Sequence, residues 1–253
     1  MLLDRIQQTL RPRTYVEIGV RFGTSLQLAL PGTTCVGIDP AAELRYPVPR
    51  RAEVFNMTSD EFFATHDLCE VLGNRPVDIA FIDGMHWFEY ALRDFANIEA
   101  ACSPGSVVFI HDCYPIDAAS AARERTTKLW SGDVWKTILA LRDLRPDLDV
   151  VTLDAKPTGL AMVTRLDPTS TALAETMDAA IEHYMDLPYE SIAADQAAVL
   201  NRAPADWESV AALLPPPFRA TSSTLLRAGR AFRMPTAAQL RSRTARRGAL
   251  TPT

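Results

Sequence analysis

A glycine turn between two short apolar segments constrains the fold of this chain more than any other feature. The elements in order are residues 14–18, the glycines Gly19 and Gly23, residues 34–38 and Asp39. Two apolar segments joined by a turn and a helix-length stretch are typical of parallel strands with a crossover helix. In such a sheet a ligand binds outside the carboxyl ends of the strands, where the glycine turn and Asp39 would meet.

The spacing of this turn points to a cofactor without a pyrophosphate. It reads Glu17-x-Gly19-x-x-x-Gly23, whereas pyrophosphate binders use Gly-x-Gly-x-x-Gly. The missing middle glycine argues against a nicotinamide-dependent oxidoreductase, and Asp39 would present its carboxylate to a ribose diol. At these residues the chain resembles the class I S-adenosylmethionine-dependent methyltransferases, whose cofactor lies on this turn. The residues expected to line the cofactor site are Glu17, Gly19, Gly23, Thr24, Ser25, Asp39, Thr58, Ser59 and Asp83.

The later apolar segments predict an α/β fold, with a Rossmann-like, doubly wound and mostly parallel sheet. Further strands are expected at residues 52–56, 77–82, 106–110, 149–153 and 160–165. The last two are joined by too few residues for a crossover helix, so they must form a terminal antiparallel hairpin. Such a hairpin at the end of a parallel sheet is the strand arrangement of class I methyltransferases. Helices are expected at residues 3–10, from Thr24 or Ser25 to residue 30, after a cap at Thr58 or Ser59, around 88–98, and at 133–144, 169–187, 195–203 and 207–214.

Three regions follow from this pattern. Residues 1–166 would form the methyltransferase domain, residues 167–218 a helical extension, and residues 219–253 a basic tail that we expect to be partly disordered. The tail has eight arginines and no acidic residue, although the whole chain has a net charge of −5. Nucleic-acid binding is disfavoured, because no aromatic residue follows Phe232 in the tail.

Acidic and imidazole side chains follow two neighbouring strands of the predicted sheet. Asp83 ends one apolar segment, and His111 and Asp112 end the next. Two carboxylates and an imidazole that converge at one sheet edge suit a divalent cation. Alternatively, His111 hydrogen-bonds to a loop backbone and is not a ligand.

Here the chain resembles the metal-dependent small-molecule O-methyltransferases, including antibiotic sugar O-methyltransferases. The motifs that carry the likeness are residues 82–86, 93–95 and 110–115, Trp135, and residues 145–147 and 157–159. The resemblance implies a metal held by Asp83, His111 and Asp112. It also implies an acidic base two residues after Asp83, where this chain has Met85. Histidine in place of an acid weakens magnesium and favours manganese, iron or zinc.

We therefore expect methyl transfer from S-adenosylmethionine to a hydroxyl of a small molecule, assisted by Mg²⁺ or Mn²⁺. The acceptor would be a sugar, a catechol or a glycosylated natural product. His86 or His111 would act as the base, since imidazole accepts protons near neutral pH. The alternative is a methyltransferase-like binding or scaffold protein without catalysis, because Met85 cannot accept a proton.

The composition of the chain restricts the class of protein and its expected location. The chain has 47% apolar and 23% charged residues, as in globular proteins, and no apolar run reaches the roughly 20 residues that span a bilayer. The first residues lack the order of a signal peptide, so we expect a cytoplasmic protein without a membrane partner. Four cysteines without Cys-x-x-Cys pairing argue against structural zinc. The sequence leaves a homo-oligomeric state open.

Overall fold

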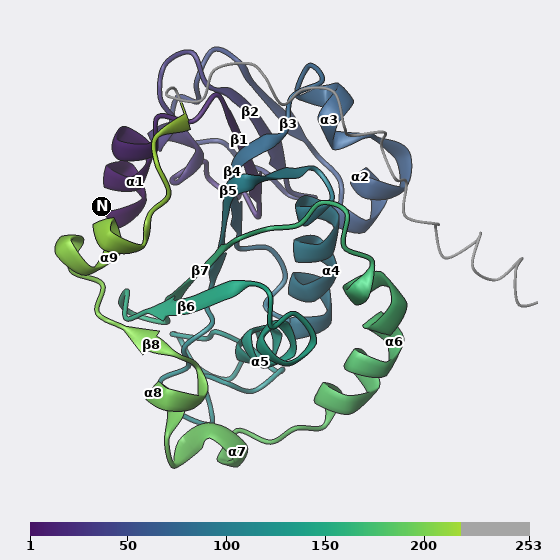
Figure 1. Ribbon diagram of the computed structural model, residues 1–253, viewed down its shortest axis with the longest axis vertical. Helices are drawn as coiled ribbons and strands as arrows, with labels where there is room; N and C mark the ends of the chain where they lie inside the picture. Colours follow the sequence, from purple (N-terminus) through teal and green to yellow (C-terminus); the bar gives the residue numbers. More distant parts are fainter. Residues whose placement is uncertain (219–253) are drawn as a thin grey trace, which may run out of the picture. The chain divides into compact units, whose positions relative to one another are not determined.

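The computed structural model describes residues 1–218, which are built around one eight-stranded sheet (Figure 1). The strand order is β3-β2-β1-β4-β5-β7-β6-β8. The strands are β1 (Thr14–Ile18), β2 (Thr34–Ile38), β3 (Ala52–Phe55), β4 (Val77–Ile82), β5 (Cys102–His111), β6 (Asp149–Leu153), β7 (Leu160–Thr164) and β8 (Arg202–Ala203). Strand β7 runs antiparallel to β5 and β6, and the other pairs are parallel. The predicted mostly parallel α/β sheet with a terminal hairpin is confirmed.

The register of the parallel strands aligns their carboxyl ends. Ile18 lies opposite Ile38 of β2 and Ile82 of β4, and Ile82 lies opposite Ile110 of β5. The chain therefore leaves the sheet at one edge after all four strands. This alignment brings together the polar residues that follow each strand, because adjacent strands are only about 4.8 Å apart.

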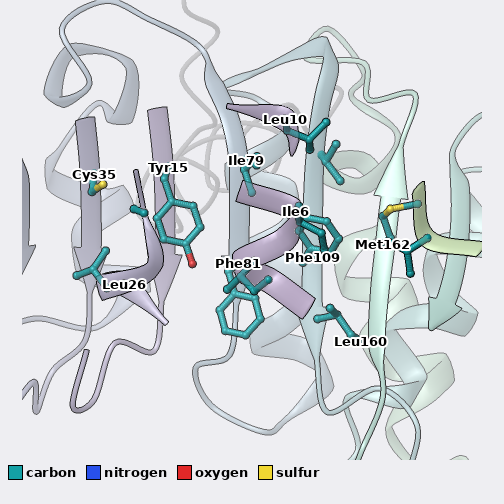
Figure 2. Close-up of a cluster of buried hydrophobic side chains, with 14 of the residues drawn as sticks. Ile6, Leu10, Tyr15, Leu26, Cys35, Ile79, Phe81, Phe109, Leu160 and Met162 are labelled. Carbon is teal, nitrogen blue, oxygen red and sulfur yellow. The ribbon is translucent and has the colours of Figure 1, made fainter. Parts of the chain in front are cut away.

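One face of the sheet packs against α1 (Leu2–Leu10) and α9 (Trp207–Leu213), which lie on the same side of it in Figure 1. Figure 2 shows Ile6 and Leu10 of α1 beside alternate strand residues such as Ile79 and Phe109. Side chains alternate along a strand, so the cluster contains Tyr15 of β1 and alternate residues of β4 and β5, namely Ile79 with Phe81 and Val107 with Phe109. The remaining strand residues face the opposite layer.

The opposite layer contains α4 (Phe88–Glu99), α5 (Trp135–Leu144) and α6 (Ala172–Met185), which contact one another. The predicted apolar stripe of α4 is confirmed, since Phe88, Leu92, Phe95 and Ile98 are all fully buried. Helix α4 also contacts β4 and β5. It therefore sets the position of the loops at the carboxyl ends of these two strands.

Two of the helix predictions were wrong. In place of a helix from Thr24 or Ser25 to residue 30, the structure has one 3₁₀ turn, η1 (Leu26–Leu28). Gly23 with φ 78° and Pro31 leave too short a stretch between them, and the backbone at Ala29 is already extended. Residues 195–203 contain only the short α8 (Gln196–Val199) and then β8.

Two further short helices, α2 (Ser59–Thr65) and α3 (Leu68–Val71), follow β3, and α7 (Glu190–Ala193) follows α6. Within residues 1–218, no helix has the length and apolar character needed to cross a membrane. The predicted basic tail, residues 219–253, lies outside the described residues. The boundary expected at residue 166 stays a prediction, although α6 to α9 do follow the last strand of the hairpin.

Candidate active site

The glycine turn after β1 is held tightly between β2 and β4. The Gly19 amide donates to the Ile38 carbonyl at 2.9 Å, and the Asp83 amide donates to the Ile18 carbonyl at 2.8 Å. Gly19 has φ 90°, and a Cβ atom there would lie 1.9 Å from the Asp83 carbonyl oxygen. Only glycine therefore lets the tip of β1 pass this close to the tip of β4.

The buried side chain of Glu17 stabilises the turn through internal hydrogen bonds. It is fully buried, and its carboxylate accepts hydrogen bonds from the hydroxyls of Tyr15 and Ser25, each at 2.7 Å. Burial raises the pKa of Glu17 to about 7, although the hydrogen bonds from Tyr15 and Ser25 oppose this shift. Both hydroxyl contacts are internal, so Glu17 and Ser25 fix the shape of the turn, while Thr24 is exposed.

Asp39 ties the end of β2 to the same turn. Its two carboxylate oxygens accept from the backbone amides of Arg21 and Ala41, each at 2.7 Å. The segment after Asp39 continues along the turn, with backbone hydrogen bonds from Glu43 to Arg21 and from Arg45 to Phe22. The predicted ribose carboxylate therefore lies beside the glycine turn, as the strand order requires.

Thr58 and Ser59 lie at the carboxyl end of β3, but both hydroxyls have partners within the protein. Thr58 caps α2 through a capping box with Glu61. Ser59 hydrogen-bonds to Asp94, a carboxyl group on α4 that is 3% exposed. These two residues position α2 against α4, and their predicted cofactor contacts stay predictions.

Asp94 gives the protein a pH-dependent stability. Burial raises its pKa to about 7, so the folded protein keeps a proton between about pH 4 and 7 that the unfolded chain has released. Stability from this group is therefore full below pH 4 and is lost as the pH rises through 7. Relative to Asp94→Asn, the unfolding free energy should fall by at most about 1.4 kcal/mol per pH unit in this window. Urea unfolding of both proteins from pH 4 to 8 checks this, and a constant difference would contradict it.

Two carboxylates and two imidazoles meet at the carboxyl ends of β4 and β5. His111 Nδ1 lies 3.2 Å from Asp83 Oδ1 and 3.2 Å from Asp112 Oδ2. His86 Nε2 lies 3.1 Å from Asp112 Oδ2 and 3.7 Å from Asp83 Oδ1. The sequence predicted all four residues, and the structure brings them to one point.

The two carboxylates favour the protonated form of His111. Burial alone would lower the pKa of His111, but its hydrogen bonds to Asp112 and Asp83 outweigh burial and raise the pKa to about 10. Burial likewise favours a raised pKa for Asp112, yet the contacts with His111 hold the pKa of this carboxyl below its usual value. The two groups thus stabilise each other as an ion pair.

Asp112 is also fixed by its backbone and by a second partner. It has φ 58°, in the left-handed region, and is 5% exposed. The buried Thr158, which precedes Gly159 after β6, donates its hydroxyl to Asp112 Oδ1. Asp112 therefore presents mainly Oδ2 to the histidines.

The geometry around His86 suits a metal ion. His86 Nδ1 lies 3.0 Å from the Trp130 carbonyl oxygen, which can only accept, so Nδ1 carries a proton. His86 Nε2 and Asp112 Oδ2 can then lie 3.1 Å apart only with a proton or a cation between them. Ligand atoms of Asp83, His86 and Asp112 all lie within 4.8 Å of one another. Neighbouring ligands at metal distances of about 2.1 Å are about 3.0–3.4 Å apart. The distances from His86 Nε2 to Asp112 Oδ2 and Asp83 Oδ1, 3.1 and 3.7 Å, are close to this range and suit a small divalent cation.

This set differs from the expected one, which included His111. The sequence placed His111 as a ligand because it aligns with an acid, but in the structure His111 Nδ1 hydrogen-bonds to the two carboxylates. His86, expected as a base, offers a third ligand atom in this candidate metal cluster, and the predicted roles of both histidines stay predictions. The involvement of Trp130 with His86 was missed, since 44 residues separate them and no local pattern links them.

Comparisons with known proteins agree with this architecture. Residues 16–113 match a family model described as a methyltransferase domain. A Klebsiella pneumoniae protein described as a candidate O-methyltransferase superposes with a TM-score of 0.50 and 12% identity, over 65% of this chain and 78% of that one. The O-methyltransferase TomG from Streptomyces achromogenes, solved with S-adenosylmethionine, gives 0.49 and 17%, over 66% and 78%. A search of curated protein sequences finds no match.

The matched residues run from β1 to the end of β5, and therefore contain the glycine turn, Asp39, Asp83 and Asp112. The Klebsiella structure, at its low identity, supports the shared fold. Residues 16–113 therefore match a methyltransferase domain, and they lie within a sheet of order 3-2-1-4-5-7-6 that has the terminal hairpin the sequence predicted.

Proposed function

We propose that this protein transfers the methyl group of S-adenosylmethionine to a hydroxyl oxygen of a small molecule, with a divalent cation held by Asp83, His86 and Asp112. The observation that carries the proposal is the place of Asp83. Its backbone lies against Gly19 in the glycine turn, and its carboxylate belongs to the candidate metal cluster with His86 and Asp112. One residue thus joins the two predicted halves of a methyl-transfer site.

The cofactor half consists of the tips of β1 and β2. In the proposal, Gly19 and Gly23 allow the cofactor to approach the backbone, and Asp39 accepts from the ribose hydroxyls. The methyl group of a sulfonium is already electrophilic, so the protein mainly has to align the acceptor oxygen with it. Alignment of this kind lowers a barrier by about 7–11 kcal/mol.

The acceptor half consists of the cluster after β4 and β5. Two carboxylate oxygens and one imidazole nitrogen favour manganese, iron or zinc over magnesium. A divalent cation held there would supply Lewis-acid chemistry that lowers the pKa of an acceptor hydroxyl. A small molecule with two neighbouring oxygens, such as a sugar or a catechol, suits this arrangement.

Of the two histidines, we assign the proton-accepting role to His111. Both ring nitrogens of His86 are engaged, one with Trp130 and one with the carboxylates. His111 contacts Asp83 and Asp112 through Nδ1 alone, so Nε2 is the atom that would receive the acceptor's proton. A divalent cation bound to Asp83 and Asp112 would repel a positive charge on His111. Metal binding therefore favours the neutral form of His111.

Exposed apolar side chains follow the same strands. Met85 after β4 is 51% exposed, and Ile116 and Leu129 in the loop after β5 are 52% and 49% exposed. Apolar groups at the edge of a ligand site suit an acceptor whose oxygens are attached to an apolar body. Alkyl catechols and alkyl glycosides are therefore the first acceptors to assay.

Crossed variants test the two halves separately. Binding of S-adenosylhomocysteine and of Mn²⁺ is measured by calorimetry for the wild type, Asp39→Asn and Asp112→Asn. We expect Asp39→Asn to weaken nucleoside binding at least tenfold and leave Mn²⁺ binding unchanged, because Asp39 follows β2, which β1 separates from β4, and its carboxylate accepts from Arg21 and Ala41. Asp112→Asn should do the reverse, weakening Mn²⁺ at least tenfold.

Turnover with labelled methyl donor, with and without chelator, then tests the reaction. Loss of turnover on chelation and in Asp112→Asn is the expected result. A wild-type protein that does not bind S-adenosylhomocysteine would overturn the proposal. Binding of both ligands without transfer to any sugar, phenol or alkyl catechol would favour the non-catalytic alternative.

A further inference from the structure

One residue of the loop between β5 and α5, Trp130, contacts the imidazole of His86 away from the nitrogen that faces the carboxylates. The Trp130 indole stacks on the imidazole, with ring centroids 4.9 Å apart and planes inclined by 16°. The backbone carbonyl of the same residue accepts from His86 Nδ1 at 3.0 Å. Trp130 therefore contacts His86 both through a ring face and through a hydrogen bond in the ring plane.

These two contacts determine which nitrogen faces the carboxylates. The carbonyl fixes the proton on Nδ1, so the lone pair of neutral His86 is on Nε2. The stacked indole prevents the ring from tilting away from Asp112, which Nε2 approaches to 3.1 Å. Histidines that bind metals generally have such a partner on their other nitrogen, and its loss typically costs 10–100-fold in metal affinity.

Trp130 is itself anchored inside the loop. Its indole Nε1–H donates to the Ala122 carbonyl at 2.6 Å, and the next residue, Ser131, donates its amide to the Ser120 carbonyl at 3.0 Å. The arrangement of residues 120–131 thus fixes both the carbonyl and the indole that His86 contacts.

The loop is in turn fastened to α4 and to the backbone of His86. The Arg123 guanidinium hydrogen-bonds to Glu89 of α4 and to the buried Asp133. At the end of the loop, Gly132 has φ 61°, and a Cβ atom there would lie 1.8 Å from the His86 carbonyl oxygen. The Asp133 amide donates to that same carbonyl at 3.2 Å. The end of the loop therefore fixes the backbone of His86 while Trp130 fixes its ring.

We propose that Trp130 is a positioning residue of the metal site, which makes His86 the third ligand by holding its Nε2 towards Asp83 and Asp112. The inference rests on the proposed metal-assisted function and goes beyond it, because it makes metal affinity depend on a loop residue that is not a ligand. A change in the conformation of the loop after β5 would then change the affinity of the metal site.

The test measures the affinity for Mn²⁺ alone, from the electron paramagnetic resonance signal of free Mn²⁺. We expect Trp130→Leu, which keeps apolar volume but lacks an aromatic face, to bind Mn²⁺ about 10–100-fold more weakly. Trp130→Phe keeps a ring to stack on and should recover most of the affinity. Lys128→Met, an exposed change in the same loop, is the matched control and should bind as the wild type does.

A double-mutant cycle separates positioning from a general structural role. If Trp130 acts through His86, then Trp130→Leu in a His86→Ala background should cause no further loss of Mn²⁺ affinity. S-adenosylhomocysteine binding, which depends on β1 and β2, should be unchanged in every variant and reports the intact fold. Should Trp130→Leu fail to fold, the same cycle is run with Trp130→Phe, whose smaller loss must also vanish in the His86→Ala background.

This inference would be overturned if Trp130→Leu bound Mn²⁺ with wild-type affinity, or if it caused the same loss of affinity in the His86→Ala background as in the wild-type background. Either result would leave the proposed function standing. A wild-type protein that binds S-adenosylhomocysteine but no Mn²⁺ would overturn the metal half of the proposed function and this inference with it.

Discussion

Gly19→Ala is expected to destabilise the protein by at least about 3 kcal/mol and to abolish binding of S-adenosylhomocysteine. The added Cβ would lie 1.9 Å from the Asp83 carbonyl oxygen and 2.4 Å from its carbon, and φ 90° is strained for alanine. Neither backbone can move without losing the hydrogen bonds that join the tips of β1, β2 and β4. Denaturant unfolding and calorimetric titration measure the two losses.

Gly105→Ala is the matched control for this change. A Cβ at Gly105 would meet no atom within 4 Å, and its φ is not in the left-handed region. We expect a stability within about 0.5 kcal/mol of the wild type and unchanged ligand binding. If the two variants behaved alike, the close approach of β1 and β4 would not be what requires a glycine.

Arg145→Met is expected to cost about 3–5 kcal/mol of unfolding free energy. Arg145 is 1% exposed and forms two hydrogen bonds with Glu99, which is 4% exposed, and it also hydrogen-bonds to Asp147. Removing the guanidinium leaves the Glu99 carboxylate buried without its cation, although the Asp167 amide still donates to it at 3.1 Å. Guanidinium chloride unfolding of the variant measures the cost.

The double variant Arg145→Met/Glu99→Gln should regain part of this loss, because no uncompensated buried charge remains. Arg165→Met serves as the surface comparison. Its guanidinium lies 3.6 Å from Asp149, but both side chains are more than half exposed, so the expected change is within about 1 kcal/mol. A similar loss in both single variants would mean that burial of the Arg145–Glu99 pair does not set its contribution.

Four strands of the sheet could be predicted closely from the sequence. The bounds of β1, β2, β4 and β6 agree with the expected ranges, because near-continuous apolar segments ended by glycine, proline or aspartate identify buried strands directly. The helix after Gly23 was overpredicted, since its leucines at alternate positions are apolar enough for a helix but occupy a stretch cut short by Pro31. The periodicity of the apolar residues does not show that the stretch between Gly23 and Pro31 is too short for a helix.

The cluster after β4 and β5 was predicted by residue type and sheet edge, whereas the roles assigned to its residues stay predictions. Asp83, His111 and Asp112 follow the ends of adjacent strands, so their proximity follows from strand order and register. The role of each imidazole depends on contacts with residues distant in sequence: Trp130 on His86, and Thr158 on Asp112. No sequence pattern carries that information.

For this protein, the sequence by itself determined seven strands of the sheet, its terminal hairpin and the edge at which the polar groups gather. Hydrophobic periodicity and turn residues act over a few positions along the chain, and these features depend on nothing more. Only the tertiary structure decided that His86 joins Asp83 and Asp112 in the candidate metal cluster, with its Nε2 facing the two carboxylates. That choice depends on a carbonyl and an indole brought in by a loop 44 residues away, and hydrogen bonds of this kind exist only once the loop has packed on α4.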